Sequence, residues 1–127
     1  MRAFMLALAF VPTVHSLASA QDDELIRAGK RQFRACQACH GLDKGDNRNS
    51  GPTLYGLFGR KVASESGFGY SDAMKGANIV WTEEALDRFL TNPQTDIPGN
   101  KMALGAVKDP EQRTQLIAYL KTATKPE

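Results

Sequence analysis

The stretch Cys36-Gln37-Ala38-Cys39-His40 decides the fold and the chemistry of this chain. Two thiols three residues apart, followed at once by an imidazole, form the C-x-x-C-H pattern of covalent c-type haem attachment. Each thiol can form a thioether with one haem vinyl group, and the adjacent histidine is then placed to ligate the iron. The motif predicts one haem c held by Cys36 and Cys39, with His40 as the first axial ligand.

This motif has three other possible interpretations. A structural zinc site needs four ligands, whereas the chain has two cysteines and two histidines, and His15 lies in a segment expected to be removed. A thioredoxin-like C-x-x-C sits at the strand-to-helix corner of a βαβ unit, but no β-branched run precedes Cys36. The remaining alternative is a chance match, and the pattern of the following chain argues against it.

Residues 1–20 have the three parts of a secretory signal peptide. Arg2 supplies the positive start, an unbroken apolar run covers residues 3–11, and Ala18-Ser19-Ala20 offers small residues for cleavage. This run is too short to span a bilayer, which needs about 20 residues. The pattern predicts export to the periplasm, cleavage after Ala20, and a soluble mature chain of residues 21–127; an uncleaved interfacial anchor is the alternative.

The mature segment has the length of one small domain. A domain of this size buries a limited core, so a large apolar cofactor would form a substantial part of its interior. An exported protein whose neighbouring cysteines are reserved for haem is consistent with an oxidising compartment. The net charge of the whole chain is +2, which argues against a nucleic-acid partner.

The chain predicts a few helices separated by long loops. Residues 22–35 should form a helix with acids in its first turn and with Leu25, Gly29 and Phe33 on one face. Residues 41–66 carry loop composition without helical period, and a loop of that length in a small domain is typically functional or wrapped around something. Met74 belongs to a short helix expected over residues 70–76, with Ser71 as its N-cap.

Two further helices follow in the second half of the chain. One should run from Thr82 to about Asn92, end at Pro93 and bury Phe89, with residues 94–107 again irregular. The last should begin at the N-cap Asp109 and bury Leu116 and Tyr119, with residues 124–127 frayed. The predicted fold is therefore all-α, a small single domain of three main helices, a short helix and long loops around one haem.

The sixth position on the iron separates electron transfer from catalysis. Only one histidine follows the leader, which excludes bis-histidine ligation, and the methionines that follow it are Met74 and Met102. Met74 is interpreted as a packing residue of its short helix. Met102 lies in a Pro-Gly loop free to approach the haem, and its thioether would raise the potential. We expect Met102 as the second axial ligand, with Lys101 or an open position as the alternatives.

The chain resembles a class I cytochrome c, similar to the mitochondrial protein and its bacterial periplasmic relatives. The resemblance covers nearly the whole mature segment, and the order and spacing of its motifs are more specific than any single motif after the first. The matching pieces are Cys36 to His40, Gly51-Pro52, Gly59-Arg60-Lys61, Tyr70, Trp81, Asn92-Pro93, Ile97-Pro98-Gly99, Lys101-Met102 and Leu116 to Lys121.

The resemblance also implies roles for individual residues. Pro52 should accept a hydrogen bond from His40, fixing the ring and raising its basicity. Arg60, Tyr70 and Trp81 correspond to the family's donors to the haem propionates. Gly29, Phe33, Leu116 and Tyr119 correspond to the contact between the first and last helices.

Several positions depart from the mitochondrial pattern. Phe89 replaces a tyrosine near the methionine sulfur, Met74 an asparagine, and Leu104 a phenylalanine beside the exposed haem edge. Ala35, Gln94, Thr95 and Asp109 replace members of a lysine ring, of which Lys44, Lys101 and Lys108 remain. These changes leave the expected fold and ligands unchanged and argue against docking to mitochondrial partners.

The resemblance implies a monomeric periplasmic carrier of single electrons, not an enzyme, with the iron cycling between Fe(II) and Fe(III). Its donors and acceptors would be membrane or soluble redox complexes, such as a cytochrome bc-type complex, a terminal oxidase, a dehydrogenase or a reaction centre. A small haem peroxidase or gas-binding protein is the contrasting hypothesis, and a haem subunit of a larger complex is a third. The pathway could be respiratory, photosynthetic or tied to the oxidation of a small substrate, and a respiratory chain is the expected one.

Overall fold

The computed structural model describes residues 15–47 and 50–127. The helices in this part of the chain are α1 (His15–Phe33), α2 (Asp72–Gly76), α3 (Glu83–Thr91), α4 (Pro93–Asp96) and α5 (Pro110–Ala123). The described residues include no strand, only an isolated antiparallel bridge between Lys61 and Val80. The expected all-α class is therefore confirmed.

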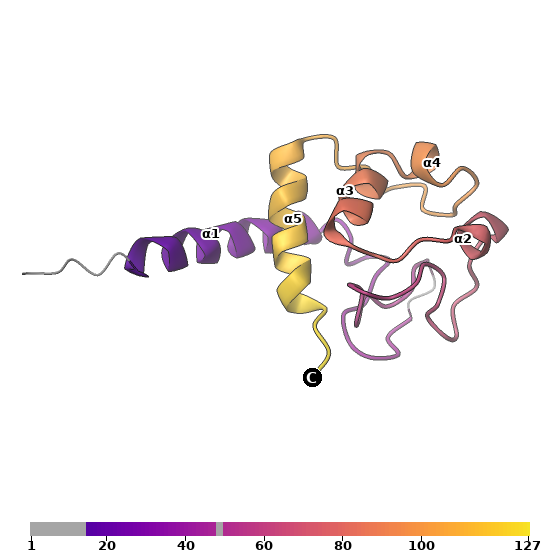
Figure 1. Ribbon diagram of the computed structural model, residues 1–127. Coiled ribbons are helices and arrows are strands. Elements are labelled where there is room, and N and C mark those ends of the chain that lie inside the picture. Colours follow the sequence, from indigo (N-terminus) through magenta and orange to yellow (C-terminus); the bar gives the residue numbers. More distant parts are fainter. Residues whose placement is uncertain (1–14, 48–49) are drawn as a thin grey trace, which may run out of the picture.

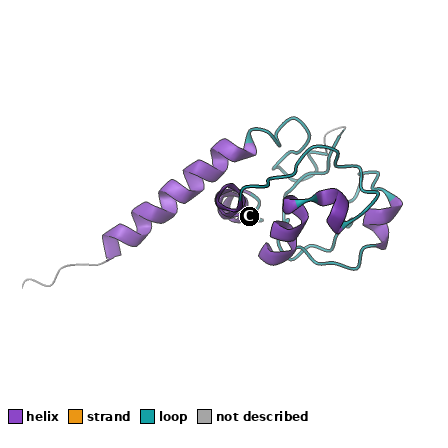
Figure 2. Cartoon of the chain, turned by 90° about the horizontal axis from the view of Figure 1, so that it is seen from above, coloured by secondary structure: helices purple, strands orange, loops and turns teal. Residues whose placement is uncertain are grey.

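Helix α1 extends away from the body of the protein, and α5 crosses its C-terminal part (Figure 1). Viewed along α5, the remaining helices and the long loops lie together on the side away from the free end of α1 (Figure 2). Helix α5 also contacts α3, and α3 contacts α4. The loops between α1 and α2, and between α4 and α5, are thus held around a frame of α1, α3 and α5.

The crossing of α1 and α5 is close because Gly29 has no side chain. A Cβ atom at this position would lie 2.6 Å from the Cβ atom of Tyr119 and closer still to the carbonyl oxygen of Gln115. One turn further along α1, the Phe33 ring lies 5.5 Å from the Tyr119 ring, and Leu116 is fully buried beside it. The residues expected to join the first and last helices do so.

Helix α3 supplies the opposite part of the core. Its N-cap is Thr82, a residue type preferred at this position, whose hydroxyl accepts a hydrogen bond from the Ala85 amide at 3.1 Å. Its buried face packs with residues from α1, α5 and the first loop. The buried hydrophobic cluster comprises Phe33, Leu57, Val62, Trp81, Ala85, Leu86, Phe89, Leu90, Ile97, Leu116, Ile117 and Leu120.

The first helix differs from the prediction at both ends. It begins at His15 instead of near Asp22 and ends at Phe33 instead of Ala35. The residues before Asp22 include Leu17, Ala18 and Ala20, which are good helix formers, so the helix extends through them. The acidic residues consequently lie in the middle of α1, where they do not interact with the N-terminal end of the helix dipole.

Two expectations for the second half of the chain were also wrong. Residues 93–96 form α4 instead of an irregular segment, because Asn92 caps this turn by accepting from the Thr95 amide at 3.2 Å and proline is well suited to the first helical position. Thr124 does not fray, since its hydroxyl bonds the Leu120 carbonyl at 2.8 Å and the residue is buried.

Residues 1–14, which hold most of the predicted signal peptide, lie outside the described residues. In the described part, no helix combines the length and the apolar character needed to cross a membrane.

Candidate functional site

A cavity of about 670 Å³ opens among α1, α3, α5 and the loops, and it contains the predicted haem motif. Phe33 of α1, Leu86 and Phe89 of α3, and Leu116 and Leu120 of α5 give it apolar walls. The cavity is also lined by all of the predicted site residues, which are Cys36, Cys39, His40, Pro52, Arg60, Tyr70, Trp81 and Met102, and by Met74, Asn100 and Lys101.

The Cys36–His40 segment is a helical turn that follows α1 directly. The Cys36 amide bonds the Phe33 carbonyl at 2.8 Å, and the His40 amide bonds the Cys36 carbonyl at 2.9 Å. This turn brings both thiols and the imidazole to the cavity wall. Burial, with a smaller effect of Cys39, raises the pKa of the Cys36 thiol, whereas a redox-active C-x-x-C needs a lowered pKa.

The imidazole of His40 is fixed in orientation by its surroundings. Its Nδ1 atom lies 2.9 Å from the carbonyl oxygen of Pro52 and donates to it, which leaves Nε2 with a free lone pair. Gly51 backs the ring, since a Cβ there would lie 2.7 Å from His40 Cε1. Burial lowers the pKa of His40, so the ring is held in the neutral form that ligates metals.

Backbone hydrogen bonds hold Arg60 and Trp81 side by side. The Trp81 amide bonds the Arg60 carbonyl at 2.9 Å, and the Gly59 amide bonds the Trp81 carbonyl at 2.8 Å. Tyr70 lies along the same cavity, and burial raises the pKa of its phenol, which keeps it a neutral donor. Arg60 and Tyr70 from the loop before α2 and Trp81 from the segment before α3 therefore line one cavity.

The guanidinium of Arg60 also orders the first loop. Its Nη2 atom donates to the Thr53 carbonyl at 3.0 Å, and Nη1 donates to the Tyr55 carbonyl at 2.8 Å and to the Glu65 carboxylate at 3.2 Å. Both side chains of the Arg60–Glu65 ion pair are largely buried, at 14% and 18% exposure. Glu65 was not identified from the sequence, in which it is an isolated acid in a polar loop.

Both candidate methionines line the cavity, one from α2 and one from the loop after α4. Met102 is half-buried and its amide bonds the side chain of Asn100 at 2.8 Å. The ammonium of Lys101, the alternative iron ligand, donates to the Gly69 carbonyl at 3.2 Å. Lys101 is therefore held by a hydrogen bond to another loop. Asn100 was also missed in the sequence, although its place directly after Pro98-Gly99 is typical of a turn-forming asparagine.

These residues fit a haem c. The cavity offers a large apolar space with two thiols, a neutral imidazole and a thioether along it, which are the groups that attach and ligate haem iron. Buried carboxylates of such a cofactor require partners, and Arg60, Tyr70 and Trp81 provide donors. In the described part of the chain, no cluster of three or more His, Cys, Asp or Glu side chains forms an alternative metal site.

Comparison with known proteins gives the same assignment. The sequence model of the family described as cytochrome c matches residues 26–124. A cytochrome c of Chlamydomonas reinhardtii is 44% identical over 109 residues, covering 86% of this chain and 97% of the relative. A cytochrome c2 of Blastochloris viridis is 41% identical, covering 93% of this chain and 87% of the relative.

A solved structure agrees with the fold. Cytochrome cH from Methylobacterium extorquens superimposes with a TM-score of 0.71 at 38% identity, covering 76% of this chain and 97% of its own. The matched family binds haem c through a C-x-x-C-H motif, and Cys36 and Cys39 fit it. The chain belongs to the cytochrome c family, as a class I member that binds one haem c covalently and carries electrons instead of catalysing a reaction.

Proposed function

We propose that this protein is a periplasmic electron carrier whose haem iron is ligated by His40 and Met102. The observation that carries this proposal is one cavity lined by Cys36, Cys39, His40 and Met102 together. When bound, haem supplies a one-electron couple between ferric and ferrous iron. The chain supplies two ligands of fixed identity, an apolar enclosure and a surface through which partners approach.

The absorption spectrum of the purified holoprotein tests this assignment. Six-coordinate, low-spin ferric iron with a sulfur-to-iron charge-transfer band, and ferrous iron that does not bind carbon monoxide, are the expected results. A high-spin ferric spectrum or rapid carbon monoxide binding would instead indicate an open sixth position. Mass spectrometry of haem-bearing peptides should place both thioethers at Cys36 and Cys39.

The remaining polar residues of the cavity have separate roles in this proposal. Pro52 holds the His40 ring through the Nδ1 hydrogen bond of 2.9 Å, which raises the basicity of the ligating nitrogen. Arg60, Tyr70 and Trp81 donate to the propionates, and burial of Tyr70 and Trp81 makes these donors hard to replace by water. The donors thereby lower the cost of burying the propionate charges.

Export with cleavage after Ala20 is supported by the surface position of the adjoining residues. Residues 17–24 are exposed, with 74% exposure for Leu17, and the family match begins at residue 26. Removing residues 17–20 would therefore uncover no core, and the mature chain 21–127 would keep the whole haem domain. Intact-mass measurement of protein from the periplasmic fraction tests both the compartment and the cleavage site.

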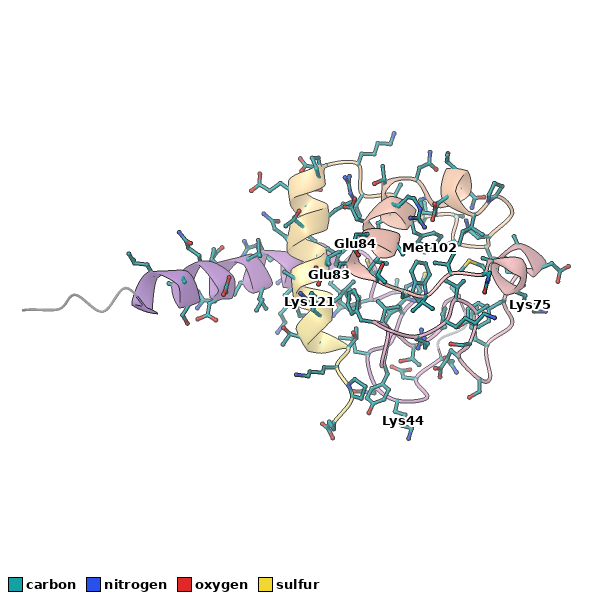
Figure 3. All side chains as sticks on the ribbon, viewed as in Figure 1. Lys44, Lys75, Glu83, Glu84, Met102 and Lys121 are labelled. Carbon is teal, nitrogen blue, oxygen red and sulfur yellow. The ribbon has the colours of Figure 1, made fainter. Side chains whose placement is uncertain are left out.

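Electron donors and acceptors in this proposal are redox complexes that meet the protein at the cavity mouth. Leu104 is 88% exposed there, and Lys101 and Lys108 are exposed beside it. Lys44, the third lysine expected in this rim, does not line the cavity as Lys101 and Lys108 do, and Figure 3 shows it well apart from Met102. Such a rim fits a partner whose surface is mainly apolar and carries a few acidic residues. The candidate partners are bc-type complexes, oxidases, dehydrogenases and reaction centres.

Electron-transfer rates with an acidic partner should fall only shallowly as ionic strength rises. Exposed charges are screened beyond about 10 Å at 0.1 M salt, and two lysines contribute less attraction than a full ring. Lys108→Gln should reduce the slope of rate against salt, whereas Lys44→Gln, the matched control, should leave it unchanged. Equal effects of the two variants, measured by stopped-flow with the same partner, would contradict this docking surface.

Phe89→Tyr should raise the reduction potential by some tens of millivolts. Phe89 is buried at the cavity, with its ring 5.2 Å from that of Trp81, and an added hydroxyl can donate to the Met102 sulfur and favour ferrous iron. A net hydrogen bond contributes about 0.5–1.5 kcal/mol, and only the difference between its strength in the ferrous and in the ferric protein shifts the potential. For one electron, about 59 mV corresponds to a tenfold change in the equilibrium constant. Voltammetry showing a lower potential, with the charge-transfer band intact, would oppose this argument.

A further inference from the structure

The side-chain amide of Asn100 connects the Met102 loop to an anchored part of the protein. Its Nδ2 atom donates to the carbonyl oxygens of Pro93 at 2.7 Å and Ile97 at 2.8 Å. Its Oδ1 atom accepts from the Met102 amide at 2.8 Å. Asn100 is only 7% exposed, so this amide satisfies buried backbone groups that water reaches poorly.

The carbonyl groups on the far side of this amide belong to a fixed segment. Pro93 and Ile97 are both buried, and Ile97 is part of the core cluster. Gln94 adds a further link, since its Nε2 atom donates to the Asn100 carbonyl at 3.0 Å. The Asn100 side chain is therefore bonded to residues at both ends of α4, and its backbone carbonyl is bonded to Gln94 within α4.

The loop that carries Met102 is more exposed than this anchor. Ala103, Leu104 and Ala106 are exposed, and Gly105 adopts φ 144°, a backbone conformation that favours glycine. The far end of the loop is closed by a 2.7 Å bond from the Val107 amide to the Leu90 carbonyl. The Asn100 side chain holds the near end through the backbone amide of Met102, two residues further along the chain.

We propose that Asn100 is a positioning residue that holds Met102 at the sixth position of the iron; this rests on the proposed His40 and Met102 ligation. An exposed loop of this kind exchanges between a state with the sulfur in place and one with the sulfur displaced. The Asn100 hydrogen bond is made to the backbone of Met102 itself, so it favours the first state. Loss of this hydrogen bond raises the population of the state with the sulfur displaced. A ligand that competes with the sulfur then binds more tightly by the factor by which that population rises.

Imidazole binding to the ferric holoprotein measures this population directly, because imidazole occupies the sixth position only when the sulfur is displaced. Asn100→Ala removes both the acceptor and the donors, and is expected to raise imidazole affinity about tenfold, which corresponds to about 1.4 kcal/mol. Asn100→Ser retains a hydroxyl that can accept from the amide two residues on, a weaker form of the same turn. Its affinity should lie between those of the native protein and the alanine variant, which provides a second variant if Asn100→Ala accumulates poorly.

Asn92→Ala is the matched control. The Asn92 side chain caps the same α4 turn by accepting from Thr95 at 3.2 Å, so its loss weakens the segment without touching Met102. Unfolding by denaturant should show that both alanine variants are destabilised, but Asn92→Ala should change imidazole affinity less than threefold. A purely structural role for Asn100 predicts equal effects at the two positions and would overturn the proposal.

The native spectrum separates this proposal from the one on which it rests. If the native ferric protein lacks the sulfur-to-iron band, the Met102 ligation is wrong and the positioning role falls with it. If the band is present and Asn100→Ala and Asn100→Ser bind imidazole within threefold of the native protein, Met102 remains the ligand and only the role of Asn100 is refuted. A graded rise from Asn to Ser to Ala, with the Asn92 control unchanged, supports it.

Discussion

Met102→Ala should lower the reduction potential by on the order of 100 mV or more, since axial ligands set haem potentials over a span of about 0.8 V. A thioether stabilises ferrous iron, and alanine cannot replace it. The sixth position should then become open or be taken by the neighbouring Lys101, whose side chain also lines the cavity. Voltammetry and the ferric spectrum, which should lose its charge-transfer band, measure both changes.

Met74→Ala is the control for this variant, because Met74 also lines the cavity and is only partly buried. Interpreted as a packing residue of α2, it should affect stability and shift the potential modestly while keeping the charge-transfer band. If Met74→Ala abolishes the band and Met102→Ala keeps it, the ligand assignment is reversed. An unchanged potential and spectrum in both variants would exclude methionine ligation altogether.

Much of the site could be predicted because its chemistry is carried by local sequence patterns. The C-x-x-C-H turn is formed by bonds between residues three and four apart, such as His40 to Cys36, and therefore needs no long-range information. The N-caps Ser71, Thr82 and Asp109 likewise bond amides two or three residues ahead. These short-range features were predicted correctly, whereas the α4 turn, which the Asn92 side chain caps at the Thr95 amide, was missed.

The features that were missed depend on contacts between distant segments or on weak local signals. Glu65 is recognisable only once the loop brings it to Arg60. Residues 124–127 were expected to fray, but the Thr124 carbonyl accepts a hydrogen bond at 2.6 Å from the amide of Gly56, a residue far away in the sequence. Asn100 bonds residues on both sides of itself, and a single asparagine in a turn does not reveal which partners it has.

Gly29→Ala should destabilise the holoprotein by about 2 kcal/mol or more, because α1 and α5 meet at this position. The added Cβ would lie 2.6 Å from the Tyr119 Cβ and within contact of the Gln115 backbone, neither of which can rotate away. Overpacking of this kind costs about 1–3 kcal/mol and occasionally more, while alanine recovers about 0.5–1 kcal/mol of helix propensity. The steric cost is expected at its upper end because backbone atoms oppose the methyl group.

Gly76→Ala is the matched control for this prediction. Gly76 is also helical, at the end of α2, and no atom lies within 4 Å of a Cβ built there. Alanine should therefore leave stability unchanged or raise it by up to about 1 kcal/mol through helix propensity alone. Denaturant unfolding followed by far-ultraviolet circular dichroism compares the two variants with the native protein. Since alanine meets no atom at Gly76 and helix propensity favours alanine in the interior of α1, a loss confined to Gly29→Ala isolates the helix crossing, whereas a stabilised Gly29→Ala would show that α1 and α5 are further apart than this contact requires.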